Sequence, residues 1–312
     1  MFSFFKRSTT NYPTPAWASF FNTAEYNQFL DRLKQYFDKE KIPFTLGDGV
    51  IEVQDTSFGA ERLGLINLAQ ICRQQPVRKW QNIIQSHFNN MREASLFQDE
   101  FNKKAHNFDL IKDYLAVRLY SNDYLSYLDD TAATIGGPVT DDITAILVFD
   151  LPKTVVNVKP EQTIQWNKTN EELFEWGREN ARKNNPVEIS SQTVAGFAIR
   201  FIQGVHFFVA NTVLDMGRYP ELVGTKGSLV GIPHRHAVLV YPIENLEVAT
   251  AVGKLIPIIR GMFEEGSGGI SPNLYWYHAN RFTTLPYELS DNKLKFYPPE
   301  AFVDMLNILE PK

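Results

Sequence analysis

The chain has 312 residues, of which 44% are hydrophobic and 21% charged, enough for a large core in one domain or two. Its 31 basic and 36 acidic residues give a net charge of -5 with no basic block, so we expect no nucleic-acid ligand. The single cysteine, Cys72, excludes an internal disulfide, and charges interrupt every long apolar stretch, so we expect a cytoplasmic protein without membrane insertion.

The first part of the chain is predicted to be a flexible leader over residues 1–20, since Pro13 and Pro15 favour extended backbone and the order of charges does not fit a signal peptide. A helix is expected from Asn22, which forms a capping-box pattern with Glu25. A hairpin over residues 44–53 and an apolar helical stripe over 80–91 follow. These elements predict a small N-terminal α/β unit over residues 21–105.

A polar stretch, residues 98–107, indicates the boundary to a larger C-terminal domain over residues 106–312. Thr169 and Glu172 predict another capped helix, and Asn245 a long helix that Pro257 should kink. Strands joined by short connections predict an antiparallel arrangement with helices on one face. The expected strands are 116–120, 143–149, 154–158, a pair around Ile189 and over 196–202, then 228–232, 236–241, 273–278 and 293–297. We therefore predict an α+β fold: a mostly antiparallel mixed sheet with helices packed on it, plus the smaller N-terminal α/β unit.

Several stretches carry a family resemblance. They are Gly47 to Asp55, Thr144 to Lys153, Trp166 to Arg182, and Gly227 to Pro242 with its Val-Gly-Ile-Pro-His-Arg core. In this order they resemble the bacterial YtpQ-like family of uncharacterised proteins, and the match covers most of residues 25–300. The chain departs from the pattern in an insert around Asp129 to Asp142. The family has no established catalytic residues, so the resemblance implies a fold and no site.

The cluster His234-Arg235-His236 lies between two apolar runs of strand length. Residues two apart on a strand face the same side, so His234 and His236 are candidate ligands for one divalent metal, with His206 or His278 as a third. Ordinary strand-end histidines are the simpler alternative. Arg235 is expected on the opposite face in a surface ion pair.

Two loops have a ligand-binding and a plain structural interpretation. The pairs Asp129-Asp130 and Asp141-Asp142 could hold Mg²⁺ or Ca²⁺, although solvated loop aspartates are commoner. The loop Glu264-Glu-Gly-Ser-Gly-Gly-Ile-Ser271 follows a helix and begins with carboxylates, which favours a mobile connection over a phosphate loop.

The run Tyr275-Trp-Tyr-His278 alternates faces along an expected strand, so core packing is its default, and an exposed Trp276 or Tyr277 would offer a protein contact. Cys72 on an apolar helical stretch is interpreted as a core residue, and no G-x-S-x-G elbow is present.

The sequence shows no group of residues typical of an acid–base or nucleophilic active site. It therefore favours a protein-binding or regulatory module that acts on a protein partner. An immunity or defence-associated protein would be one example of such a module. The candidate surface is His234, Arg235, His236, Trp276 and Tyr277. No cofactor is predicted. The alternative is a metal-dependent hydrolase using His234 and His236, with Asp141 and Asp142. A third interpretation is small-ligand sensing near residues 266–271.

Overall fold

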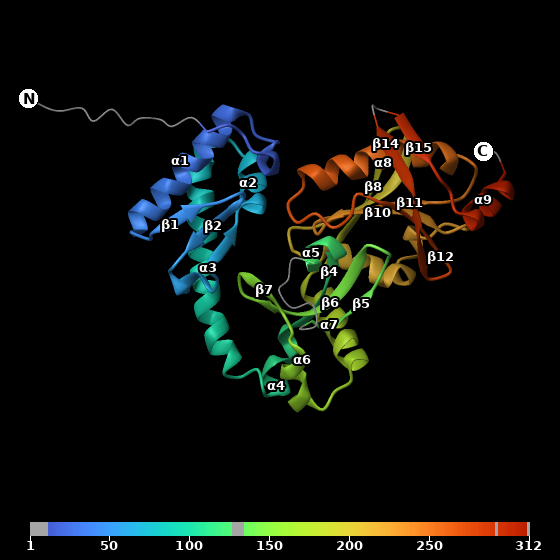
Figure 1. The fold of residues 1–312 in the computed structure, drawn as a ribbon. Helices are drawn as coiled ribbons and strands as arrows, with labels where there is room; N and C mark the ends of the chain where they lie inside the picture. The colour runs from blue at the N-terminus through green and yellow to red at the C-terminus, as the bar shows by residue number, and fades with distance from the viewer. Residues whose placement is uncertain (1–11, 127–133, 291–292, 311–312) are drawn as a thin grey trace, which may run out of the picture. The chain divides into compact units, whose positions relative to one another are not determined.

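The computed structural model describes residues 12–126, 134–290 and 293–310 (Figure 1). The chain divides into two compact units, unit 1 over residues 1–99 and unit 2 over residues 100–312. Within the described residues, no helix combines the length and apolar character needed to span a membrane.

Unit 1 packs helices against a small antiparallel sheet with the strand order β1-β2-β3. Its elements are η1 (Ala16–Ala18), α1 (Thr23–Glu40), β1 (Phe44–Leu46), β2 (Val50–Val53), η2 (Thr56–Phe58), β3 (Arg62–Gly64), α2 (Ile66–Arg73), η3 (Val77–Lys79) and α3 (Trp80–Asn102), which continues into unit 2. Aromatic rings fill the core, with Phe88 against Tyr36, Phe37 and Phe58. Cys72 is buried among them, as the sequence indicates.

The N-terminal segment differs from the expected leader. Residues 1–11 lie outside the described part, whereas Ala18 and Phe21 are buried in the core of unit 1 and Trp17 packs against it. Proline at 13 and 15 does not prevent this, because the apolar side chains that follow are available for burial. The unit boundary after residue 99 falls within α3, six residues before the boundary at 105 that the polar composition suggests.

The first half of unit 2 forms a small antiparallel sheet in which β6 pairs with β4, β5 and β7. Its elements are α4 (Phe108–Ile111), η4 (Lys112–Tyr114), β4 (Leu115–Ser121), α5 (Asn122–Ser126), β5 (Gly136–Pro138), β6 (Ile143–Leu151), β7 (Thr154–Asn157), α6 (Pro160–Thr163), η6 (Ile164–Trp166) and α7 (Asn170–Asn184). Helix α7 packs on β4, where Gly177 lies directly over the backbone of Ala116.

The second half forms an antiparallel sheet with the order β13-β12-β10-β11-β9-β8. Its strands and helices are β8 (Glu188–Val194), β9 (Phe197–Gln203), η7 (Val209–Arg218), η8 (Pro220–Leu222), β10 (Ser228–His234), β11 (Ala237–Pro242), α8 (Val248–Glu265), β12 (Leu274–His278) and β13 (Arg281–Leu285). A hairpin of β14 (Tyr287–Ser290) and β15 (Lys293–Phe296), then α9 (Glu300–Asn307), ends the described chain.

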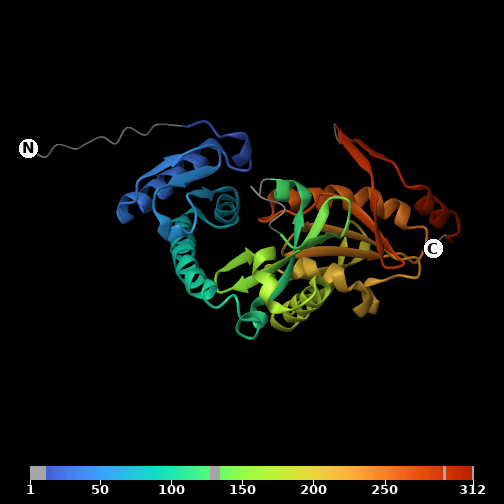
Figure 2. The ribbon, with the colours of Figure 1, turned by 60° about the horizontal axis from the view of Figure 1, so that its bottom comes forward.

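The six-stranded sheet is covered on both faces, not on one as the sequence suggests. Leu229, Leu239 and Trp276 face α8, which runs along the sheet in Figures 1 and 2. Their neighbours in the strands, including Val230 and Tyr275, are also fully buried. Alternate residues of a strand point to opposite faces, so both faces are packed. On the second face, η7 contacts β11 and β4.

Every strand pairing found in the described residues is antiparallel, and the α+β class is confirmed. The capping boxes at Asn22 and Thr169 are present as predicted. Asn245 accepts a hydrogen bond from the Glu247 backbone just before α8, and Pro257 lies inside that helix.

Candidate functional site

The cluster His234-Arg235-His236 forms the tight turn between β10 and β11, not a regular stretch of strand. The pairing register shifts between Gly231 and His234, and His234 pairs with Ala237 across the turn. Strand alternation therefore does not apply here. Arg235 lies on the side of His236, and its Nε donates to His236 Nε2 over 3.1 Å. The expected placement of Arg235 on the opposite face is corrected by this turn.

The hydrogen bonds of the turn assign the histidine tautomers. His236 Nε2 accepts from Arg235, so Nδ1 carries the proton and donates to the His206 carbonyl at 3.0 Å. His234 Nδ1 accepts from the His236 backbone N–H at 3.3 Å. Burial, followed by the charge of Arg235, lowers the pKa of both rings, that of His236 to about 4. Both are therefore neutral at pH 7.

The geometry gives little support to a metal site at the turn. Both ring nitrogens of His236 are engaged, and His206 uses its nitrogens for Pro186 and Phe208. His278 stacks on Trp276 instead of joining the turn. Across the part of the chain that the structure describes, no three metal-binding side chains come together. Asp129 and Asp130 lie outside that part.

Arg235 and a second arginine lie against the same aromatic ring. Its guanidinium carbon lies 4.5 Å from the centroid of Phe207, and that of Arg118 on β4 lies 5.7 Å from the same ring. Arg118 also lies 4.9 Å from the ring of Tyr120, which stacks on Tyr124. Within the described residues neither arginine forms an ion pair, so the expected surface ion pair of Arg235 is not there.

The glycine-rich loop packs against this turn and is not a loose connection. The Arg235 backbone N–H donates to the Gly268 carbonyl, and Ile270 donates to Pro233. A Cβ at Gly266 would stand 2.3 Å from the His234 ring, and one at Gly268 would stand 2.8 Å from the Arg235 side chain. The glycines are therefore needed for close approach, and no helix follows to form a phosphate loop.

The structure places Trp276 and Tyr277 in the protein interior, with 6% and 7% of their surfaces exposed. The indole N–H of Trp276 donates to the Lys226 carbonyl, and its ring packs edge-on against Phe302. Core packing, which we expect by default for residues 275–278, is therefore observed for Trp276 and Tyr277. Trp276 therefore offers no contact surface, whereas Tyr277 lines an open pocket of unit 2.

Asp141 and Asp142 have different surroundings. Asp142 accepts hydrogen bonds from Ser271 at 2.6 Å, Tyr275 at 2.6 Å and Asn273 at 2.9 Å, so it links the two sheets of unit 2. Asp141 is exposed and accepts from Thr284. Burial, then the charge of Asp142, raises the pKa of the Tyr275 hydroxyl, which stays protonated. Asp142 is thus occupied by hydroxyl and amide donors, and the described residues contain no metal-binding group of three that joins it to His234.

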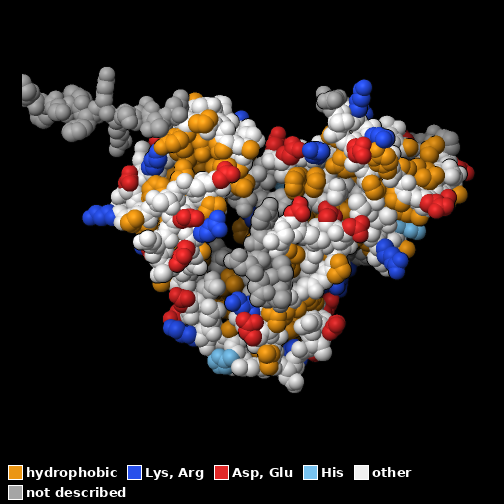
Figure 3. Space-filling view, viewed as in Figure 1, with side chains coloured by type: hydrophobic (Ala, Val, Ile, Leu, Met, Phe, Trp, Pro, Cys, Tyr) orange, Lys and Arg blue, Asp and Glu red, His pale blue; other side chains and the backbone are white. Residues whose placement is uncertain are grey.

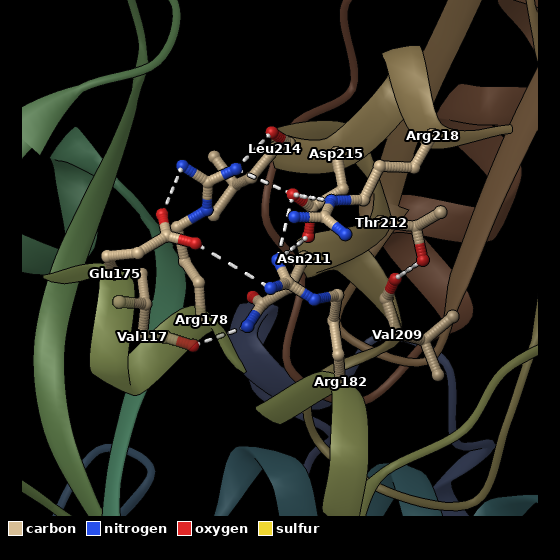
Figure 4. A network of polar contacts seen from close by, with 10 residues as sticks. All are labelled: Val117, Glu175, Arg178, Arg182, Val209, Asn211, Thr212, Leu214, Asp215 and Arg218. Carbon is tan, nitrogen blue, oxygen red and sulfur yellow. Dashed lines mark hydrogen bonds and ion pairs between the residues drawn. The ribbon is translucent and has the colours of Figure 1, made fainter. Parts of the chain in front are cut away.

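An arginine cluster that the sequence does not signal surrounds Asp215 in η7 (Figure 4). Arg178 donates to its carboxylate at 2.6 Å, Arg182 at 3.0 Å, and Arg218 lies 3.7 Å away. The Asp215 side chain is only 5% exposed. Glu175 pairs with Arg178 and Arg182 from the helix face. Burial opposes protonation of Arg182, but the hydrogen bond to Asp215 and the charges of Asp215, Glu175 and Glu179 together outweigh it and raise the pKa of Arg182.

The cluster forms one wall of an open pocket of about 420 Å³. Arg178, Asp215 and Arg218 are the charged residues in its lining, and Tyr277 and Asn280 add polar groups joined by a 2.9 Å hydrogen bond. The one carboxylate is already held by arginines. The pocket therefore has a positive surplus in a chain of net charge -5.

Residue spacing explains why the cluster is not evident in the sequence. Arg178 and Arg182 are four apart on a helix, a pattern typical of a solvated face. Asp215 follows an apolar run, and its only local partner is Arg218, three residues later. Only the packing of α7 beside η7 brings these groups together.

Comparison with family models, curated proteins and solved structures finds no match to this chain. The resemblance to the YtpQ-like family stays a prediction.

Proposed function

We propose that this protein is a binding or regulatory module whose larger unit recognises an acidic side chain of a protein partner in the pocket beside Arg218. The observation that carries the proposal is the excess of arginine over free carboxylate in a concave, accessible pocket. Bidentate arginine–carboxylate contacts are a common way to fix the register of a partner.

The pocket walls support recognition of a protein segment. Arg218 has 61% of its side chain exposed and only a 3.7 Å contact to Asp215, so its guanidinium is available to a second carboxylate. The part-buried Phe282 supplies aromatic surface next to it, and the buried side chains of Met216 and Tyr277 also line the pocket. Arginine and tyrosine are enriched among residues that dominate binding energy at interfaces. On the face drawn in Figure 3, acidic and basic side chains are interspersed, so a local arginine surplus is a distinguishing feature.

The test is a charge reversal at the pocket mouth. Three tagged proteins are used to capture partners from a lysate of the source cells: the wild type, Arg218→Glu and a control. The control is Lys254→Glu, which changes an exposed position of α8. A partner retained by wild type and control and lost with Arg218→Glu supports the proposal. Binding should return when an acidic residue of that partner is replaced by lysine. Equal capture by all three proteins would contradict the role of the pocket.

The cytoplasm is the proposed location. Burial raises the pKa of the Cys72 thiol to about 12, so the sole cysteine is an unreactive core residue. A chain of this size without disulfides is typical of a reducing compartment.

A further inference from the structure

We infer that unit 2 contains a second, separate binding site, for a phosphate group, between Arg118 and Arg235. This site goes beyond the proposed partner pocket and shares no residue with it. It is formed by β4, by the loop that carries Phe207, and by the β10–β11 turn.

The first reason is uncompensated charge. Two guanidinium groups lie on one phenyl ring, half-buried, and neither forms an ion pair among the described residues. Burial, and then the charge of Arg118, lowers the pKa of Arg235 to about 10, so the two charges act on each other. Like charges in a partly desolvated setting destabilise the fold unless an anion joins them.

The second reason is an unpaired donor. Among the described residues Arg118 Nε is buried and has no hydrogen-bond acceptor, although the guanidinium as a whole interacts with Tyr120. Buried polar groups are nearly always paired, and a charged donor left alone is among the most costly exceptions. Burial raises the pKa of the nearby Asp150 carboxyl group and the charge of Arg118 acts against this rise, but no ion pair between the two is found in the described residues.

The third reason is the way the turn is held. Arg235 is fixed by its bond to His236 Nε2, by stacking on Phe207, and by the Gly268 carbonyl on its backbone N–H. The glycine at 268 leaves the space that its side chain occupies. A preorganised pair of planar guanidiniums matches the tetrahedral oxygens of phosphate. The neutral ring of His234 beside it, whose Nδ1 accepts a backbone N–H, adds an Nε2–H donor without adding fixed charge.

The experiment measures thermal unfolding of the full-length protein at pH 7 with increasing sodium phosphate, at an ionic strength held constant with sodium chloride. We expect the Tm of wild type to rise with phosphate and to saturate. The Arg118 Nε–Hε resonance should shift along the same curve in arginine-selective NMR spectra. The variants Arg118→Gln and Arg235→Gln should lose the phosphate response, and the control Arg260→Gln, on the exposed face of α8, should keep it.

Stability without phosphate separates this inference from a purely structural role. If the arginines repel each other in the empty site, each single variant has a Tm equal to or above that of wild type at low ionic strength. If they serve only to pack on Phe207, each variant has a lower Tm and wild type does not respond to phosphate. That second result would overturn the inference.

A second titration, with phosphoserine as the free amino acid, identifies the source of the phosphate. Saturation by both ligands indicates a phosphate group carried on a larger molecule, and saturation by inorganic phosphate alone indicates the free anion. The absence of a response to either ligand would also overturn the inference.

Discussion

At the scale of single residues, the neighbouring side chains of Asp141 and Asp142 have different roles because only Asp142 is partly buried among hydrogen-bond donors. Asp142 is surrounded by donors, whereas Asp141 faces solvent. The sequence alone gives no reason to expect a different environment for the two carboxylates. The difference is a consequence of tertiary packing, since the donors to Asp142 come from residues about 130 positions later.

Replacing Asp142 should therefore destabilise unit 2 far more than replacing Asp141. Asp142→Ala removes the acceptor of the Ser271 and Tyr275 hydroxyls, leaving two buried donors with one bond between them. We expect a loss of about 4 kcal/mol in the free energy of unfolding, because each unsatisfied buried group costs roughly 1–3 kcal/mol. Asp141→Ala should change it by less than about 0.5 kcal/mol. Urea denaturation measures both, and similar values for the two variants would contradict the network.

The His236 ring should make stability depend on pH. Its pKa is about 4 in the folded protein and 6.5 when exposed, so between these values the unfolded chain binds more protons. Its contribution to stability is complete above pH 6.5 and is lost as the pH falls toward 4. The ring is part-exposed, so solvent screening leaves about 2 kcal/mol of the full shift.

This dependence is measured by comparing the free energy of unfolding at pH 7 and pH 4.5. The fall on acidification should be smaller in His236→Gln than in wild type, and His106→Gln, at an exposed position, serves as the control. An unchanged fall in His236→Gln would show that the ring is not responsible.

At the scale of elements, local signals in the sequence predict helices and most strands, because they depend on neighbours along the chain. The capping boxes at Asn22 and Thr169 and the hairpin around Gly49 are examples. Strand β5 escapes prediction because its residues, Gly136–Pro138, have no apolar alternation and depend on pairing with β6. The Asp215 cluster escapes for the same reason, since Arg178 and Arg182, which hold its carboxylate, lie on a separate element, α7.

The contact between α7 and β4 gives a test in which the usual helix preference is reversed. Alanine normally stabilises a helix relative to glycine by about 1 kcal/mol. At Gly177, however, a Cβ would lie 2.9 Å from the Ala116 backbone, so Gly177→Ala should destabilise by about 1–3 kcal/mol. Gly253 in α8 has its nearest neighbour at 3.9 Å, and Gly253→Ala should be neutral or stabilising. Chemical denaturation of the two variants checks the sign of each effect.

At the scale of the whole molecule, each unit has a hydrophobic core of its own. Phe88→Ala in unit 1 should cost about 3–5 kcal/mol, the usual range for a buried phenylalanine. Hydrogen exchange should then become faster in α1 and α3 while β10 and β12 keep their protection. Ile259→Ala in unit 2 should give the opposite pattern. Faster hydrogen exchange in both units in either variant would mean that the two units unfold together and not independently.

The position of β12 in the sheet affects how the protein is made. This strand pairs with β10 in the interior of the sheet, yet it is synthesised only after β11 and the whole of α8. Sequence-distant pairings form late in folding, and incomplete sheets expose strand edges that promote aggregation. Unit 1 can complete its core while translation continues, whereas the nascent unit 2 has an open edge at β10 until residues 274–278 leave the ribosome. A stalled or truncated chain would therefore be a substrate for chaperones or proteases through this edge.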